Sequence, residues 1–528
     1  MEYPSERFTE EERARLAPHF TDLDGPVFAL VNLPETVKGA LFARYSRYPG
    51  TLRRLFLDEF ADSLPDAGGV PWTPDEGARA AELYERVFLG FGDDSVAQLG
   101  GAHVACEWVS NVLTKVLQRP RLAAYLEQST RYIAYDAPVP SPPGGYRYYR
   151  DPELGPEYEA AMDELFRIYS AALPRVTAWA AERFPRGEGE PEAAHARAVK
   201  AKALDLLRGL LPAASLSHMG IFATGQTYEQ LILHLLAHPL PEAQRYGRMV
   251  LGAVQSVIPS FVTRVERPDR GGRWVEYLRE REAAGRRWAE RLDLNESDEA
   301  TGPSVRLLRV EGTEEDLLAA LLFEAAQVDE TRAREVVAAL GADERAALLR
   351  DLVGDRENRR HRPGRGFETL RYRFEIVSDY GAFRDLQRHR MLTCQWQALS
   401  PRSGADVPEE IDEAGLGDKY RRALEISRVE YDRLTDRGLH HAAPYAVCLG
   451  YRIRYILDMN ARAAMQLIEL RSGREGHPSY RAIAQEMHAR IEEVQPAVGA
   501  AIHMAGESRP HLERLVAEAR KRAPARLH

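Results

Sequence analysis

The sequence predicts an α+β protein built from two related halves. Three observations support this prediction: the length and composition of the chain, a strand followed by a helix near the start of each half, and short sequence matches between the halves. Together they indicate a divergent tandem duplication, in which one chain contains two copies of the same fold.

Length and composition are those of a globular protein with two domains. The chain has 528 residues, 44% hydrophobic and 29% charged, which suffices for two ordinary cores. Its net charge of −9 predicts neither a nucleic-acid partner nor a membrane partner. It shows no apolar run of ~18 residues and no signal-peptide core, so we expect a cytoplasmic protein. Three cysteines without metal-ligand spacing predict reduced thiols and no metal site.

Each half begins with the same predicted pair of elements. In the first half, the apolar run at 27–31 predicts a strand, and residues 35–46 predict the helix that follows it. In the second half, residues 305–310 predict a strand, and leucines and alanines three and four residues apart predict a helix at 314–327. Long amphipathic helices are expected later in each half, over 157–184 and 419–437.

A linker is expected between the halves. Residues 274–292 read as a charged helix, and residues 295–303 are rich in helix breakers. We therefore predict a first domain at 1–268, a helical linker at 269–302 and a second domain at 303–528.

Two short segments recur in both halves. Leu117–Leu122 resembles Leu386–Met391, and Gln230–Ile232 is repeated as Gln466–Ile468. The two segments are farther apart in the first half than in the second, so the first half has extra residues between them. We expect these in proline- and glycine-rich loops, at 138–145 or 185–191.

The most informative motif is Arg388, His389 and Arg390. A guanidinium binds phosphate through two parallel hydrogen bonds and keeps its charge, whereas an imidazole titrates near neutral pH. The triplet predicts a site for a phosphorylated ligand beside a reactive ring. A solvated basic turn is the alternative, because the chain contains 71 lysines and arginines.

Two further segments group polar residues. If Glu127 to Arg131 is extended, Ser129 and these two residues share one face; if it is helical, Glu127 and Arg131 form an ion pair. If Asn460 to Arg471 is helical, about three turns bring the two residues back to nearly the same face. Asn460 could instead be only an N-cap, and Arg471 a favourable charge at the helix end.

With these motifs, the chain resembles two fused copies of the flavin-dependent thymidylate synthase family. The family signature is Arg-His-Arg, seven residues and then Ser, with Glu and Arg two residues before and after that Ser. The first half has the later part, Glu127, Ser129 and Arg131, but a proline, Pro120, in place of the histidine. The second half has Arg-His-Arg but lacks the later part, with Trp396, Ala398 and Ser400 instead.

Three other family landmarks are present. An Asn-x-Arg with a later Arg on a leucine-rich helix corresponds to Asn460, Arg462 and Arg471. An Arg-x-x-Leu-Pro motif begins at Arg208, and a Glu upstream of Arg-His-Arg corresponds to Glu368. The resemblance implies two copies of the family fold, each a mixed sheet with long helices, arranged as a pseudo-dimer within one chain.

The losses in the two halves are complementary. In the first half, the positions that match His389, Asn460, Arg462 and Arg471 hold other residues, namely Pro120, Thr224, Gln226 and Leu235. In the second half, the positions that match Glu127, Ser129, Arg131 and Arg208 hold other residues, namely Trp396, Ala398, Ser400 and Pro444. Because the family builds its sites from several subunits, the resemblance implies one composite site per chain.

The activity implied by the resemblance is reductive methylation of dUMP to dTMP. Methylenetetrahydrofolate supplies the carbon, and FAD reduced by NADPH supplies the hydride. By analogy, FAD contacts Arg388, His389, Arg390, Asn460, Arg462, Glu368 and Glu127. By the same analogy, dUMP contacts Ser129, Arg131, Arg208, Arg388 and Arg471, and Arg471 acts in catalysis by stabilising the deprotonated uracil ring.

The resemblance also implies a homodimer that imitates the family's tetramer. Two departures from the family pattern count against catalysis: a carboxylate, Asp385, stands where a neutral amide is usual, and Gln466 replaces a common His or Asn. A catalytically silent nucleotide- or flavin-binding paralogue, acting as a sensor or partner protein, is therefore the alternative. A nucleic-acid-associated protein is disfavoured by the acidic net charge.

Overall fold

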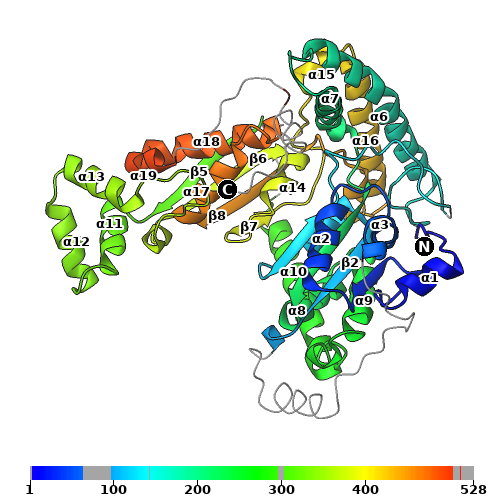
Figure 1. The fold of residues 1–528 in the computed structure, drawn as a ribbon, viewed down its shortest axis with the longest axis horizontal. Coiled ribbons are helices and arrows are strands. Elements are labelled where there is room, and N and C mark those ends of the chain that lie inside the picture. The colour runs from blue at the N-terminus through cyan, green and yellow to red at the C-terminus, as the bar shows by residue number, and fades with distance from the viewer. Residues whose placement is uncertain (1–2, 64–96, 142, 295–301, 503–511, 513–528) are drawn as a thin grey trace. The chain divides into compact units, whose positions relative to one another are not determined.

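The computed structural model describes residues 3–63, 97–141, 143–294, 302–502 and 512 (Figure 1). Most of the breaker-rich stretch at 295–303 lies outside these residues. None of the described helices is long and apolar enough to cross a membrane. Cys106 and Cys448 are buried and Cys394 is partly buried, and all three are outside any disulfide, as predicted.

Two four-stranded sheets have the same strand order. The first has the order β1-β2-β4-β3 and comprises β1 (Val27–Leu30), β2 (Gly101–Ser110), β3 (Ala123–Glu127) and β4 (Leu216–Thr224). The second has the order β5-β6-β8-β7 and comprises β5 (Ser304–Glu311), β6 (Arg371–Asp379), β7 (Thr393–Trp396) and β8 (Arg452–Asn460). The repeated order confirms the α+β tandem duplication. All the described pairings are antiparallel, so the expectation of mixed sheets was wrong.

The chain packs into two compact units that exchange segments of sequence. Unit 1 comprises Met1–Ser170, Leu211–Ser297 and Glu425–Val447, and unit 2 comprises Ala171–Leu210, Asp298–Leu424 and Cys448–His528. The unit boundaries therefore do not coincide with the predicted domains 1–268 and 303–528. Two boundaries lie within the long helices α6 (Pro156–Arg183) and α16 (Gly417–Asp436).

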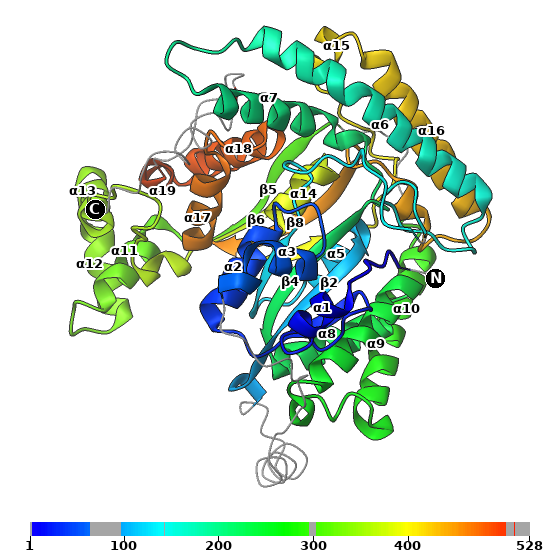
Figure 2. The ribbon, with the colours of Figure 1, turned by 45° about the vertical axis from the view of Figure 1, so that its right-hand side comes forward.

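Unit 1 has helices on both faces of its sheet (Figure 2). A cluster of buried side chains joins α1 to α3 with β1 and β2, including Phe28, Phe42, Phe56 and Ala105. Helices α8 and α9 pack on the sheet, and α10 packs on α8. The helices of this unit, apart from the shared ones, are α1 (Glu10–Leu16), α2 (Glu35–Tyr45), α3 (Leu52–Glu59), α5 (Asn111–Leu117), α8 (Gly225–Ala237), α9 (Pro241–Gln255) and α10 (Arg273–Arg291).

Unit 2 packs α14, α17 and α18 against its sheet (Figure 1). Alternate residues of β6, namely Tyr372, Phe374 and Ile376, are fully buried, as the period of a strand with one core face requires. Its helices are α7 (Glu192–Leu207), α11 (Glu314–Phe323), α12 (Glu330–Ala339), α13 (Ala342–Val353), α14 (Tyr380–Leu386), α15 (Glu409–Glu413), α17 (Ala461–Arg471), α18 (Pro478–Val494) and α19 (Pro496–Ala501).

The elements predicted from the sequence are confirmed within one or two residues, with one exception. The helix predicted over 314–327 ends at Phe323, and the N–H groups of Ala325 and Ala326 after it both donate to the carbonyl of Leu322. The described residues of the two predicted loops, 138–145 and 185–191, contain neither helix nor strand.

Candidate active site

The Arg-His-Arg motif lies in the turn between α14 and β7 of unit 2. Asp379 caps the N-terminus of α14 by accepting a hydrogen bond from the N–H of Ala382 at 2.9 Å. After the helix ends, Arg388 and Arg390 are exposed and His389 is partly buried. The turn therefore exposes the two guanidinium groups and partly buries the imidazole.

Helix α17 brings a second motif to this turn. Asn460 ends β8 and caps α17, because its side chain accepts a hydrogen bond from the N–H of Ala463 at 2.8 Å. The helix then runs to Arg471, as predicted. Arg471 Nε donates a hydrogen bond to His389 Nε2 at 2.9 Å, and its guanidinium lies 5.4 Å from the centre of the Tyr480 ring. Two motifs that are distant in sequence thus meet in one contact.

Burial and this contact both favour the neutral form of the His389 ring. Burial, and next the positive charge of Arg471, lower the pKa of His389 to about 3. Because Nε2 accepts a hydrogen bond, the single proton of the neutral ring is on Nδ1. Burial also lowers the pKa of Arg471. The expectation of an imidazole that titrates near neutral pH was therefore wrong, and His389 serves here as a neutral acceptor.

A cavity of about 290 Å³ opens at this contact. It is lined by Arg362, Arg388, His389, Arg390, Met391, Leu392, Ala463, Gln466, Leu470 and Arg471. Within the described part of the chain, neither Arg362 nor Arg390 has an acidic partner. Four arginines around one cavity favour an anionic ligand with more than one phosphate, because guanidinium groups bind phosphate oxygens in pairs.

The contribution of Arg362 was missed from the sequence. Residues 360–362 repeat the triplet Arg-His-Arg, and this repetition could have pointed to them. Only Arg362 of this second triplet lines the cavity, so the triplet alone would not have identified the residue that matters.

Arg462 and Glu368, both predicted to contact a cofactor, are brought together. Arg462 Nη1 lies 3.4 Å from Glu368 Oε1, and Arg462 Nε donates to the carbonyl of Pro363 at 3.0 Å. Glu368 also lies 3.3 Å from Arg365. This group anchors the first turn of α17 to the segment before β6, so its present contacts are structural.

Arg208 is a first-half residue that the structure places in unit 2. It follows α7, is 4% exposed, and lies 3.3 Å from Asp385 and 3.5 Å from Asp379. Asp385 is also 3.8 Å from Arg388. The expected repulsion between Asp385 and a bound phosphate is therefore offset by two arginines.

Glu127, Ser129 and Arg131 belong to unit 1, and their predicted shared face is not formed. Strand β3 ends at Glu127, and residues 130–132 turn, with the N–H of Arg131 donating to Ser129 Oγ at 3.2 Å. The helical alternative is also wrong. Glu127 is buried and accepts hydrogen bonds from Lys115 at 3.0 Å and Gln118 at 2.8 Å, so it stabilises the core of its own unit.

Comparison with known proteins identifies the family. The model of the thymidylate synthase complementing protein family, whose members are flavin-dependent thymidylate synthases, matches residues 62–260 and 313–497. The chain belongs to this family. The two matches show the tandem two-domain form, and each contains most of one sheet. Membership gives the chain a thymidylate synthase-like function of the nucleotide methyltransferase type.

Relatives of similar length are found in distant organisms. The chain is 37% identical to a UPF0159 protein of Chlamydia pneumoniae, over 93% of this chain and 94% of the relative. It is 31% identical to a UPF0159 protein of Thermoplasma acidophilum, over 92% and 99% respectively. The structure of the UMP/dUMP methylase PolB from Streptomyces cacaoi aligns with 18% identity and a TM-score of 0.32, over 39% of this chain and 96% of that one.

Proposed function

We propose that this chain is an FAD-dependent thymidylate synthase-like enzyme that converts dUMP to dTMP with methylenetetrahydrofolate and NADPH. The observation that carries the proposal is the cavity where the turn after α14 meets the end of α17. Four family landmark residues, Arg388, His389, Arg390 and Arg471, line it together with Arg362. Family membership supplies the reaction class, and the cavity supplies the cations that a phosphorylated cofactor and nucleotide require.

The residues present fit a flavin dinucleotide. Arg362 and Arg390 have no acidic partner among the described residues, so they can neutralise a pyrophosphate without breaking an existing ion pair. When bound, FAD supplies hydride transfer, and the protein positions the rings and balances charge. His389 contributes a neutral ring, and its Nε2 already accepts a hydrogen bond from Arg471.

Arg471 is proposed to act on the nucleotide. Its guanidinium is held between His389 and the Tyr480 ring, so its position is set before a ligand arrives. A fixed cation beside a uracil ring stabilises negative charge that develops on the ring during methyl transfer. Burial strengthens that interaction, because water screens it less.

The test is the visible absorption spectrum of the purified protein before and after dUMP is added, followed by an assay of dTMP formation. We expect a flavin band that shifts with dUMP. Arg390→Ala and Arg362→Ala should each weaken FAD binding about tenfold, the value of one charge-assisted contact. Arg360→Ala, a neighbouring exposed arginine outside the cavity lining, is the matched control and should leave binding unchanged.

A silent nucleotide- or flavin-binding paralogue remains the second candidate. The observation that favours it is the pairing of Arg208 with both Asp379 and Asp385, because a dUMP phosphate must compete with two carboxylates for that arginine. This candidate predicts ligand binding without dTMP formation. A colourless protein that takes up no FAD would contradict both candidates.

A further inference from the structure

Gln128 anchors the turn of unit 1 that contains Ser129 and Arg131. The side chain is buried, with 1% of its surface exposed. Its backbone N–H donates to the carbonyl of His218 in β4 at 2.9 Å, and its side-chain Nε2 donates to the carbonyl of Tyr48 at 2.6 Å. The start of the turn is therefore attached to the sheet and to the segment that follows α2.

Arg147 holds the other end of the Gln128 amide. Its Nη2 donates a hydrogen bond to Gln128 Oε1. The guanidinium carbon lies 5.2 Å from the centre of the Trp108 ring and 5.0 Å from the centre of the Tyr135 ring. Because the face of an aromatic ring attracts a cation, the two rings help to fix the guanidinium in place. Both polar atoms of the Gln128 amide are thus held by neighbours, which restricts its orientation.

The backbone beneath Arg147 is strained. Trp108 has a φ of 57°, in the left-handed region that a bulky side chain rarely adopts. It lies where the pairing of β2 with β4 shifts register, between Cys106 and Val109. Its N–H donates to His218 Nδ1 at 3.1 Å. Such backbone persists only where its surroundings enforce it, and it occurs mainly at functional sites.

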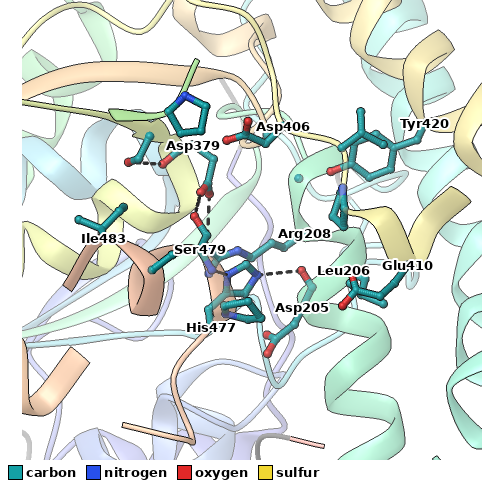
Figure 3. Close-up of a pocket in the computed structure, with 18 of the residues that line it drawn as sticks. Asp205, Leu206, Arg208, Asp379, Asp406, Glu410, Tyr420, His477, Ser479 and Ile483 are labelled. Carbon is teal, nitrogen blue, oxygen red and sulfur yellow. Dashed lines mark hydrogen bonds and ion pairs between the residues drawn. The ribbon is translucent and has the colours of Figure 1, made fainter. Parts of the chain in front are cut away.

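The charge of Arg147 is not balanced by a neighbouring carboxylate. The side chain is 6% exposed, and it has no acidic partner among the described residues. Glu107, the buried carboxylate of this region, lies 3.3 Å from Arg53 instead. Arg208 in unit 2, the buried arginine that the family analogy assigns to dUMP, differs in this respect because it lies 3.5 Å from Asp379 (Figure 3). A buried cation without an acidic partner stabilises an anion that binds nearby.

The anchored turn offers Ser129 as a hydrogen-bond donor. The backbone N–H of Ser129 donates to the carbonyl of Ser46 at 3.1 Å. Ser129 Oγ accepts a hydrogen bond from the backbone N–H of Arg131 at 3.2 Å. A hydroxyl that accepts in this way keeps its own proton for a ligand, and phosphate oxygens are suitable acceptors.

We propose that Arg147 is a positioning residue for the phosphate of the nucleotide. Through Gln128 it holds the turn in which Ser129 and Arg131 bind that phosphate, and its charge favours the bound anion. This inference rests on the proposed function, in which dUMP contacts Ser129 and Arg131. Neither Arg147 nor Gln128 contacts the nucleotide, so their effect should fall on the phosphate and not on the base.

The test compares the binding of dUMP with that of deoxyuridine, which lacks only the phosphate, by calorimetry on the full-length protein. Arg147→Met keeps the unbranched stem but removes the hydrogen bond and the charge. It should weaken dUMP binding about tenfold, the value of one charge-assisted contact, and change deoxyuridine binding by less than about twofold. Arg147→Lys keeps the charge but not the planar group, so it should recover part of the lost affinity.

Gln128→Met provides a second test, because it removes the amide and leaves the arginine in place. It should also weaken dUMP binding selectively, with folding of each variant verified by circular dichroism. Arg150→Met is the matched control. Arg150 stacks on the Tyr148 ring at 3.7 Å and donates to the carbonyl of Tyr146 at 3.0 Å, so its loss should not affect dUMP binding.

A measurement without ligand tests the same contact. Hydrogen exchange at the backbone N–H groups of Ser129 and Arg131 should be faster in Arg147→Met than in the native protein, and unchanged in Arg150→Met. Unchanged exchange, unchanged dUMP affinity in both test variants, or equal weakening of dUMP and deoxyuridine would overturn this inference and leave the proposed function intact. A native protein that binds dUMP no better than deoxyuridine would overturn both.

Discussion

Replacing Arg471 by methionine should raise the pKa of the His389 ring, because it removes one of the two causes that lower this pKa. Methionine keeps the unbranched apolar stem of arginine but removes both the hydrogen bond from Nε and the positive charge. In the native protein, the Arg471 Nε atom lies 2.9 Å from His389 Nε2, and the pKa of His389 is lowered to about 3. Without the guanidinium, protonation of His389 at Nε2 no longer places two positive charges side by side.

The expected change in pKa follows from Coulomb's law. Two charges roughly 4 Å apart interact by about 1 kcal/mol in water and about 4 kcal/mol at an effective dielectric constant of 20. These energies correspond to about one to three pKa units. Burial is the largest cause of the lowered pKa and remains in the variant. The pKa of His389 in Arg471→Met should therefore rise by about one to three units and stay below 6.5.

The assay is a titration of the imidazole nitrogens by NMR, with His389 assigned by comparison with His389→Gln. In the native protein, the neutral ring should show the Nδ1–H tautomer between pH 5 and 8. In Arg471→Met, the neutral ring is no longer held in that tautomer, and it should protonate at higher pH. A native ring with its proton on Nε2, or an unchanged pKa in the variant, would refute the contact between Arg471 and His389.

The same pair makes stability depend on pH. An unfolded chain protonates its histidines near pH 6.5, whereas folded His389 resists protonation until about pH 3. The unfolded state therefore binds more protons between these values, and stability is lost as the pH falls from 6.5 toward 3. At pH 5 the loss from this residue should reach up to about 2 kcal/mol. Urea unfolding at pH 7.5 and pH 5 should show a smaller loss in Arg471→Met than in the native protein.

Other substitutions test the remaining assignments. Asp385→Asn should strengthen dUMP binding several-fold in a calorimetric titration, because Arg208 loses a competing carboxylate; unchanged or weaker binding would mean that Arg208 does not meet the phosphate. Leu235→Arg, which restores a family arginine in the first half, should destabilise the fold by several kcal/mol in urea unfolding, because Leu235 is fully buried. If the complementary losses reflect one shared reaction, Arg131→Ala and His389→Ala should each abolish dTMP formation, and loss from only one would contradict that model.

Local sequence determined the elements that carry the second-half motifs. The leucine-rich run from Asn460 to Arg471 is sufficient to predict an N-cap and a helix, and the structure has both. The strand and helix near the start of each half were predictable in the same way. These features depend on residues a few positions apart, so the period of apolar residues and the capping chemistry reveal them.

Only the tertiary structure decided which side chains meet. The sequence does not show that Arg471 occupies His389 Nε2, because the two residues come from different elements and their contact depends on how α17 packs near the turn after α14. Nor does the sequence show that Arg208, which belongs to the first half, lies against Asp379 and Asp385 in unit 2. The extended face expected at Glu127, Ser129 and Arg131 was wrong for a related reason. Strand β3 ends where its pairing with β4 ends, and that limit depends on the partner strand.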